Sequence, residues 1–234
     1  MNRLGVKNKE EFNSIINELN NSNLKLKGIY THIYEASNKE KTNEQIEIFK
    51  HVTSDIDLNK IDIIHIAQSD TLINYPKIDF CNGCRLGILM YGLTDNDLDL
   101  KNTIELVSEI IEIKQIKKGE TIGYNGTYTA KKDELIGIVS IGYADGVNRK
   151  LKGAYIFINN KKYKIVGNIC MDMLMVKIDK NVKLNDIVYI YKDISHIKYL
   201  SKYLKTIPYE LICNISKRVL RKYKVNLHFI LNVV

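Results

Sequence analysis

A single tyrosine stands where an apolar segment runs into a turn bracketed by glycines. Residues 139–146 read Val-Ser-Ile-Gly-Tyr-Ala-Asp-Gly, and Tyr143 follows Gly142 directly. The apolar run over 135–141 predicts a buried strand, and glycine permits tight turns and close backbone approaches. A phenol at such a strand end is held firmly and still reaches an opening, where it could transfer a proton. The alternative is a core tyrosine whose hydroxyl binds a backbone group.

Four cysteines could in principle support metal or redox chemistry. Cys81 and Cys84 form one C-x-x-C pair, whereas Cys170 and Cys213 stand alone. A structural zinc site needs a second pair or histidines at short spacing, and neither is present. The pair leads into Arg-Leu-Gly rather than into the helix of a thioredoxin-like unit. We therefore expect reduced thiols and no metal.

Composition limits the class of protein. With 234 residues, of which 45% are hydrophobic, the chain can bury the core of one large domain or two modest ones. No apolar run approaches the ~20 residues that cross a bilayer, and the start lacks the pattern of a secretory signal, so we expect a cytoplasmic protein without membrane contact. The net charge is +8, but the lysines are scattered along the whole chain. This distribution does not favour a nucleic-acid partner.

The elements that must position these residues change in kind near residue 100. Before it, strands and helices alternate, which is typical of a parallel α/β barrel. About four of the eight barrel strands are visible, which would leave open sheet edges, exposed apolar faces and poor solubility. The expected elements are a strand end at 1–5, a helix from about 10 to 19, a strand over 26–31, a helix over 39–56, a strand over 61–67, a short helix after 68, and a strand ending at Arg85.

After residue 100, closely spaced strands with Gly and Asn turns predict a β-rich domain. We therefore expect an α/β plus β fold: the second half of a (β/α)8 TIM-like barrel over 1–100, and a β-rich C-terminal domain over 101–234. The strands are expected over 103–116, 134–141, 154–158, 162–166, 171–178 and 187–191, with a helix over 194–204.

Seven segments, in one order over nearly the whole chain, resemble the C-terminal part of alanine racemases, which are pyridoxal-phosphate enzymes of fold type III. One segment alone would be a weak signal, and the shared order makes it strong. The segments are residues 1–5, 28–32, 84–88 with 91–93, 123–130, 141–146, 166–172 and 206–210.

The resemblance implies a barrel that holds pyridoxal phosphate at its strand ends, and a β domain that completes the partner's site across a homodimer. Racemisation of an amino-acid substrate needs a base on each face of the α-carbon. In the family, the tyrosine of the Gly-Tyr-Ala-Asp-Gly turn serves one face, which makes Tyr143 the tyrosine base. A free tyrosine titrates near pH ~10, so nearby donors or cations must assist it.

The resemblance also implies roles for other residues. Out of context, each has a plain structural alternative: a surface arginine, a core histidine or a turn glycine. The implied roles are Arg85 at the pyridine nitrogen, His32 linking Arg85 toward the tyrosine, Arg3 near the cofactor's phenolic oxygen and the substrate carboxylate, Met171 (beside Asp172) at the substrate, and Ser69, Gly87, Ile88 and Tyr209 around the phosphate.

The sequence departs from the family at the lysine that binds the cofactor covalently. That lysine lies in a Val-Lys-Ala-Asn-Ala-Tyr-Gly type of segment, and no stretch here matches it. Lys39 lies in a charged helix and is not a substitute. Gln68-Ser69-Asp70 also replaces the usual Asn-Ser-Ala. The resemblance thus predicts a chain that begins about half way through the barrel and is inactive by itself.

Three interpretations remain. The first is the C-terminal portion of an alanine racemase, which converts L-alanine to D-alanine for peptidoglycan precursors and works only with a complementing N-terminal half; serine is the alternative substrate. The second is a non-catalytic remnant. The third, least favoured, is a basic β domain used for binding, including binding of nucleic acid, which salt-sensitive retention on nucleic acid would support.

Overall fold

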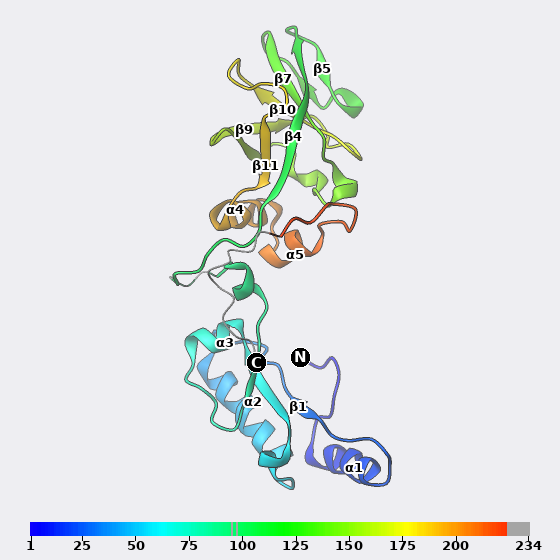
Figure 1. The fold of residues 1–234 in the computed structure, drawn as a ribbon, viewed down its shortest axis with the longest axis vertical. Coiled ribbons are helices and arrows are strands. Elements are labelled where there is room, and N and C mark those ends of the chain that lie inside the picture. The colour runs from blue at the N-terminus through cyan, green and yellow to red at the C-terminus, as the bar shows by residue number, and fades with distance from the viewer. Residues whose placement is uncertain (95, 97, 224–234) are drawn as a thin grey trace. The chain divides into compact units, whose positions relative to one another are not determined.

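The structure is a computed structural model that describes residues 1–94, 96 and 98–223. It divides into two compact units, Met1–Leu98 and Asp99–Val234, which are described separately (Figure 1). The change from alternating helices and strands to closely spaced strands falls at this division.

The first unit alternates helices with short strands. Asparagine side chains begin its two longer helices: the Asn8 side-chain oxygen accepts a hydrogen bond from the Glu11 N–H, and that of Asn38 accepts one from the Lys41 N–H. These bonds satisfy main-chain donors that a helix leaves free in its first turn. The elements are α1 (Lys9–Asn20), β1 (Gly28–Tyr30), α2 (Lys39–Val52), the 3-10 turn η1 (Leu58–Lys60), β2 (Ile63–Gln68), α3 (Ser69–Asn74), β3 (Gly83–Arg85) and the 3-10 turn η2 (Ile88–Tyr91).

The three strands form one parallel sheet in the order β1-β2-β3. Ile29 pairs with Ile64 between β1 and β2, and His65 pairs with Gly83 between β2 and β3. Successive side chains of a strand point to opposite faces, so His65 faces away from the side on which Ile64 and Ile66 are buried.

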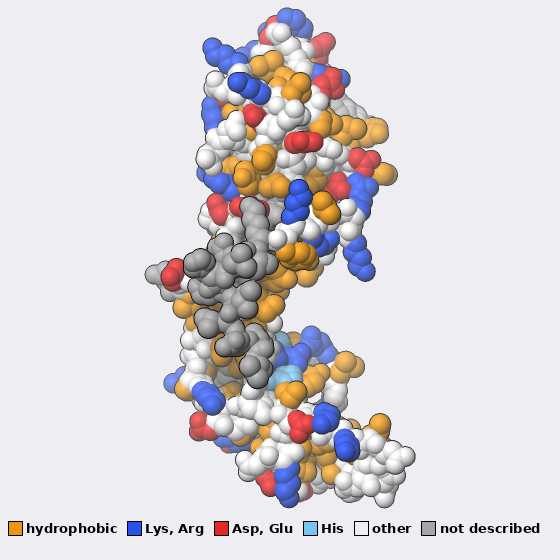
Figure 2. Space-filling model, viewed as in Figure 1, with side chains coloured by type: hydrophobic (Ala, Val, Ile, Leu, Met, Phe, Trp, Pro, Cys, Tyr) orange, Lys and Arg blue, Asp and Glu red, His pale blue; other side chains and the backbone are white. Residues whose placement is uncertain are grey.

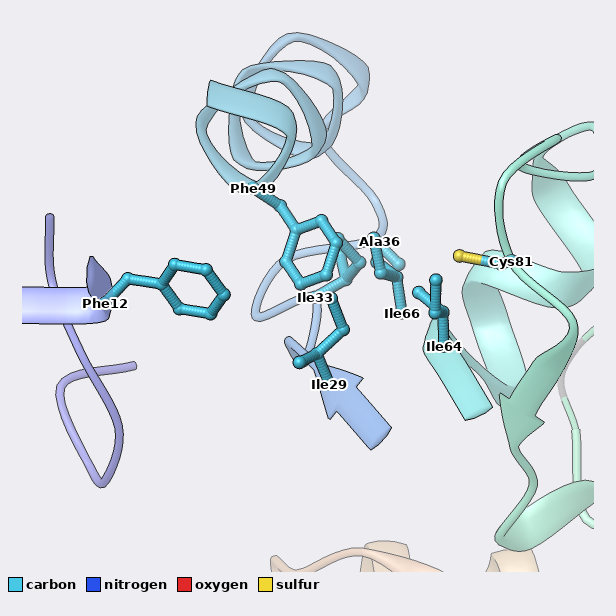
Figure 3. Packing of buried hydrophobic residues seen from close by; sticks show 8 residues of the cluster. All are labelled: Phe12, Ile29, Ile33, Ala36, Phe49, Ile64, Ile66 and Cys81. Carbon is cyan, nitrogen blue, oxygen red and sulfur yellow. The ribbon is translucent and has the colours of Figure 1, made fainter. Parts of the chain in front are cut away.

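The buried face of this sheet forms the core of the unit (Figure 3). Phe49 of α2 points toward Ile33 and Ile29, and Phe12 of α1 points toward the same cluster. Both helices pack on this face, and the opposite face of β2 carries Ile63, His65 and Ala67. The buried cluster is Phe12, Ile29, Ile33, Ala36, Phe49, Ile64, Ile66 and Cys81.

Two expectations for this unit need correction. The strand end expected at residues 1–5 is wrong, because the segment is irregular: Asn2 has φ 49° and Gly5 has φ 95°, which lie in the left-handed region that strands exclude. The unit as described therefore has three strands rather than about four. The helix expected over 39–56 is confirmed but ends at Val52, where Thr53 leaves the helical conformation.

The second unit is built on a closed antiparallel barrel with strand order β10-β7-β4-β11-β8-β9. Antiparallel strands need only short turns between them, which is why Gly and Asn recur in this part of the sequence. Its elements are β4 (Leu106–Ile116), β5 (Thr121–Ile122), η3 (Tyr124–Gly126), β6 (Tyr128–Thr129), β7 (Glu134–Val139), η4 (Tyr143–Asp145), η5 (Arg149–Leu151), β8 (Tyr155–Ile158), β9 (Lys161–Val166), β10 (Leu174–Ile178), β11 (Ile187–Tyr191), α4 (Ile194–Leu204) and α5 (Pro208–Cys213).

The six strands expected here are all present, but four are shorter than expected: β4 starts at Leu106 rather than 103, and β8 starts at Tyr155 rather than 154. β7 stops at Val139 rather than 141, and β10 starts at Leu174 rather than 171. Beyond these strand ends, the Tyr143 and Ala144 N–H groups bond to the loop that carries Cys170 and Met171, as described below. The helix expected over 194–204 is confirmed as α4, whereas α5, which has Pro208 in its first turn, was not anticipated.

The described part of the chain contains no helix that is both long and apolar enough to cross a membrane. On the face drawn in Figure 2, Lys and Arg side chains alternate with Asp and Glu on both units. This mixture agrees with the scattered lysines of the sequence and does not favour nucleic-acid binding.

Candidate active site

Polar residues of the first unit gather at the carboxyl ends of its parallel strands. β1 ends at Tyr30 and is followed by His32, β2 is followed directly by Ser69, and β3 ends at Arg85. Because parallel strands present these ends at one edge of the sheet, the residues lie close together. α/β enzymes build their sites at this edge.

Arg85 is the centre of this group. Its Nε donates a hydrogen bond to Nδ1 of His32 over 3.1 Å, and its Nη1 lies 3.4 Å from Nδ1 of His65. The guanidinium also lies 4.4 Å from the centre of the Tyr30 ring, which stacks on His65 at 5.0 Å. These contacts fix the direction of a permanently charged donor.

Burial and the charge of Arg85 both disfavour protonation of the two histidines. Burial, followed by the positive charges of Arg85 and Arg3, lowers the pKa of His32. Burial and then Arg85 likewise lower the pKa of His65. A neutral imidazole can accept the Arg85 N–H at Nδ1, so the proton of His32 lies on Nε2.

Helix α2 holds the segment that carries His32. The side-chain amide of Gln45 donates to Oγ1 of Thr31 over 3.0 Å and to the carbonyl of His32 over 2.9 Å. The core contact of Phe49 ties the same helix to the sheet. The site thus depends on a residue that sequence reasoning missed, because Gln45 lies in a helix that reads as charged and solvated.

Ser69, Gly87 and Ile88 also come together. The Ser69 residue is 2% exposed, and its Oγ accepts a hydrogen bond from the Gly87 N–H over 3.1 Å. Ile88 begins η2 directly after Gly87. A hydroxyl and adjacent main-chain N–H groups are the donors that hold phosphates, so the arrangement is compatible with an anion.

Arg3 lies at a hollow of about 540 Å³ in the first unit. The hollow is bordered by Thr31, Tyr34 and Gln45, the residues that surround the His32 segment. The positive charge of Arg3 contributes to the lowered pKa of His32, so Arg3 acts electrostatically on the residues around Arg85. Its expected contact with a substrate carboxylate remains a prediction.

Tyr143 begins the η4 turn of the second unit, and 42% of the residue is exposed. The alternative of a core tyrosine is therefore wrong. The turn is fixed by its backbone: the Tyr143 N–H donates to the Cys170 carbonyl, and the Ala144 N–H donates to the Met171 carbonyl, each over 3.0 Å. The Arg149 guanidinium lies 6.0 Å from the Tyr143 ring centre.

Gly142 permits this loop-to-loop contact. A Cβ at this position would lie 2.4 Å from the Cys170 carbonyl oxygen and 2.3 Å from that of Met171, which no other residue could accept without a backbone shift. The backbone of Met171, an exposed residue, is thereby held against the Tyr143 turn. The structure thus brings two of the residues predicted from the sequence to one place.

Tyr209 is the remaining predicted residue of the second unit. Tyr209 lies in the first turn of α5 and is 41% exposed. Tyr143, Met171 and Tyr209 belong to the second unit, whereas His32, Arg85 and the Ser69 group belong to the first. Their expected meeting across two subunits remains a prediction.

Sequence reasoning also missed His65, Tyr30 and Arg218. His65 lies within a strand predicted as almost wholly apolar, and one polar residue between two isoleucines is the available sequence signal. Arg218 pairs with Asp145 and Asp172, which lie 73 and 46 residues away in the sequence. No local pattern could have indicated that contact.

The four cysteines are free thiols, as expected. Burial raises the pKa of the Cys81 thiol, which makes it less reactive. Within the described residues, no three His, Cys, Asp or Glu side chains are grouped so that they could hold a metal ion.

Family models account for most of the chain. The family "Alanine racemase, N-terminal domain" matches residues 1–95, and "Alanine racemase, C-terminal domain" matches residues 103–223. The chain belongs to the alanine racemase family. It has that family's fold, with an N-terminal domain of the barrel type and a C-terminal β domain.

Individual relatives match more of the chain than either family model does alone. Alanine racemase 1 of Bacillus subtilis is 38% identical over 97% of this chain, which spans 61% of that protein. Alanine racemase from Bacillus anthracis, solved with bound L-Ala-P, is 31% identical with a TM-score of 0.85 over 94% of this chain and 61% of its own. The Bartonella henselae enzyme, solved with covalently bound pyridoxal phosphate, is 26% identical with a TM-score of 0.81 over 96% of this chain and 64% of its own. The chain therefore spans somewhat over three fifths of each of these relatives.

Proposed function

We propose that this chain supplies the cofactor cradle and the tyrosine base of a pyridoxal-phosphate-dependent racemase that interconverts L- and D-alanine for peptidoglycan precursors. The observation that carries the proposal is the Arg85–His32 pair at the strand ends, with Ser69 and Gly87 bonded to each other at the same edge. Membership of the alanine racemase family supports it. Four free thiols are compatible with the reducing cytoplasm as its location.

The residues of the first unit fit pyridoxal phosphate. The Ser69 hydroxyl, to which the Gly87 N–H donates, and the main-chain N–H of Ile88 would hold its phosphate, and Tyr209 of the second unit would add a hydroxyl. Arg85 would donate to its ring nitrogen. When bound, the cofactor supplies the electron sink that makes the α-proton of an amino acid acidic. Since a guanidinium keeps its proton, Arg85 favours simple return of the α-proton over transamination.

Tyr143 would move the proton on one face of the α-carbon. Its hydroxyl is carried by a turn that is bonded to the Met171 loop, so base and substrate contact would be positioned together. Arg3 would bind the substrate carboxylate. For these residues to act with the Arg85 group of the other unit, we propose a homodimer in which each β domain completes the partner's site.

The covalent lysine would come from outside the printed 234 residues. No stretch of this sequence matches the family's Val-Lys-Ala-Asn-Ala-Tyr-Gly segment. The described unit holds three parallel strands, β1, β2 and β3, and an eight-stranded barrel needs more. We therefore propose that residues 1–100 form the second half of the barrel, that residues 101–234 form the β domain, and that a complementing N-terminal half brings the lysine.

Complementation tests the proposal. The purified chain is incubated with pyridoxal phosphate, reduced with borohydride and mapped by mass spectrometry, alone and after co-expression with the N-terminal barrel segment of the Bacillus subtilis relative. We expect no pyridoxyl-lysine and no racemisation from the chain alone. With the complementing segment, we expect an adduct on that segment's lysine and racemisation of alanine that Tyr143→Phe removes.

Other outcomes identify the alternatives. A stable pyridoxyl adduct on one lysine of this chain would refute the external lysine. A complex that binds pyridoxal phosphate but racemises nothing would indicate a remnant without catalysis. Faster turnover of serine than of alanine by the complex would reassign the substrate.

A further inference from the structure

Three segments that are distant in the sequence meet around the Tyr143 turn. The first is the turn itself, 142–146, and the second is the loop 170–172. The third is the segment 214–221 after α5, which we call the C-terminal strap. The Ser216 N–H of the strap donates to the Asp145 carbonyl over 3.0 Å. The strap therefore bonds directly to the turn that carries the proposed base.

Gly146 shows how closely the strap approaches the turn. A Cβ on Gly146 would lie 2.2 Å from the Asn214 carbonyl oxygen, and Gly146 has φ 106°. Only glycine fits both this conformation and this contact. The strap is thus packed backbone to backbone against the turn.

Arg218 of the strap joins the two other segments. Its Nε donates to Oδ1 of Asp145 over 2.7 Å, and its Nη2 donates to Oδ1 of Asp172 over 2.6 Å. The other carboxylate oxygen of Asp145 accepts the Gly142 N–H over 2.8 Å. One guanidinium therefore bridges the turn of Tyr143 and the loop of Met171 through charge-assisted bonds.

The electrostatics agree with this geometry. Burial alone would raise the pKa of Asp145, but the Arg218 guanidinium and the Gly142 N–H outweigh it and hold the pKa below its usual value. The Asp145 side chain is 14% exposed, whereas those of Arg218 and Asp172 are 48% and 57% exposed. Asp145 is thus the anchored partner, and Asp172 is the partner that Arg218 holds in place near the surface.

We propose that Arg218 is a positioning residue for the racemase chemistry: it clamps the Tyr143 turn to the Met171 loop, and so fixes the distance between the proposed base and the proposed substrate contact. The proposal rests on the proposed function of Tyr143 and Met171. Arg218 itself contacts neither the phenol nor a reacting atom, and it acts only through Asp145 and Asp172.

A lysine cannot replace this residue fully. A guanidinium presents several donors in a planar fork, whereas an ammonium is a single charged point. Arg218→Lys can hold one carboxylate but not bridge two in the same geometry. Arg218→Gln removes the charge, and Lys217→Gln removes an exposed neighbouring charge as the matched control.

Amide hydrogen exchange on the 234-residue chain tests the clamp without activity. We expect Arg218→Gln to accelerate exchange of the Tyr143 and Ala144 amides about 3- to 10-fold, since partly exposed charged bonds have modest strength. Arg218→Lys should be intermediate, and Lys217→Gln should match the wild type. Amides of β7, such as that of Ile136, should be unchanged in all variants.

Two results would overturn the clamp: unchanged exchange at Tyr143 and Ala144 in Arg218→Gln, or an equal rise at the β7 amides, which would indicate general destabilisation. In the complemented enzyme, Arg218→Gln should lower kcat about 10-fold or more, with partial rescue in Arg218→Lys. Wild-type kcat in Arg218→Gln would refute a role in positioning. An inactive wild-type complex would instead refute the proposed function, while the exchange data would still decide the clamp.

Discussion

The Nε of Arg85 donates to Nδ1 of His32 over 3.1 Å, so the arginine bonds to the unprotonated nitrogen of the imidazole. His32 can accept this bond only when Nδ1 carries no proton. Burial and the Arg85 charge both lower the pKa of His32, which keeps it in that form. The pair therefore behaves as a charged donor backed by a neutral imidazole.

Removing the charge of Arg85 should raise the pKa of His32. In Arg85→Gln, one of the charges that disfavour the imidazolium is lost, whereas Arg85→Lys retains it. NMR titration of the imidazole Cε1–H resonances measures the change. A pKa of His32 that is the same in Arg85→Gln and the wild type would show that the arginine does not set its protonation.

Tyr143→Phe should reduce racemisation by the complemented enzyme at least about 100-fold, as expected for loss of a general base or acid. The ratio of kcat/KM in the two directions is fixed by the equilibrium between enantiomers, so it cannot reveal which face Tyr143 serves. Incorporation of solvent deuterium into each enantiomer without inversion can reveal which face Tyr143 serves. We expect one enantiomer to retain exchange in the variant and the other to lose it; equal loss for both would argue against a face-specific role.

Gly146→Ala should destabilise the second unit far more than Gly119→Ala. Both glycines have positive φ, 106° and 90°, but the new Cβ at 146 meets the Asn214 carbonyl, whereas at 119 it meets nothing within 4 Å. We expect the free energy of unfolding to fall by about 1 kcal/mol in Gly119→Ala, from backbone strain alone, and by about 3 kcal/mol or more in Gly146→Ala. Urea denaturation measures both, and similar losses would contradict the close approach of the strap.

His196 should make the second unit less stable in mild acid. The side chain is buried, with Nε2 3.0 Å from the Tyr155 carbonyl and Nδ1 accepting the Lys192 N–H. Burial lowers the pKa of His196 and outweighs the raising effects of the Tyr155 carbonyl and Asp193. Below the unfolded pKa of about 6.5, His196 is protonated in the unfolded chain but stays neutral in the folded chain. The free energy of unfolding therefore decreases as the pH is lowered.

Urea midpoints at about pH 7.5 and about pH 5 test this effect. The wild type should lose more stability between the two than His196→Gln, which has no imidazole to titrate. Lys162, Lys192 and Asp193 act on the ring and are present in both proteins. His196 also lowers the pKa of Asp193, so the comparison reports the histidine together with this coupling. An identical pH dependence in the variant would exclude His196 as its source.

Much of the fold could be predicted because it is encoded locally. Apolar runs such as 187–191 and the spacing of α4 gave these elements correct bounds. The prediction for residues 1–5 is wrong because, in sequence, a short segment before a helix resembles a strand end. The left-handed backbone angles of Asn2 and Gly5 cannot be seen in a sequence.

The candidate site was predictable only in part. Ordered motifs pointed to His32 and Arg85, which the structure places in contact. The supporting contacts of Gln45 and Arg218 depend on segments that folding brings together, and hydrogen bonds between distant segments leave no periodic signal. The roles of Arg3 and Tyr209 remain predictions.

Six of the eight described strands of the second unit close into a barrel, so each of these six already has a neighbour on both sides. This barrel has no edge strand to which a strand of another copy could be added. If two copies pair through it, side chains and connecting loops must make the junction. Such pairing could therefore be strengthened or abolished by surface substitutions that leave the architecture intact.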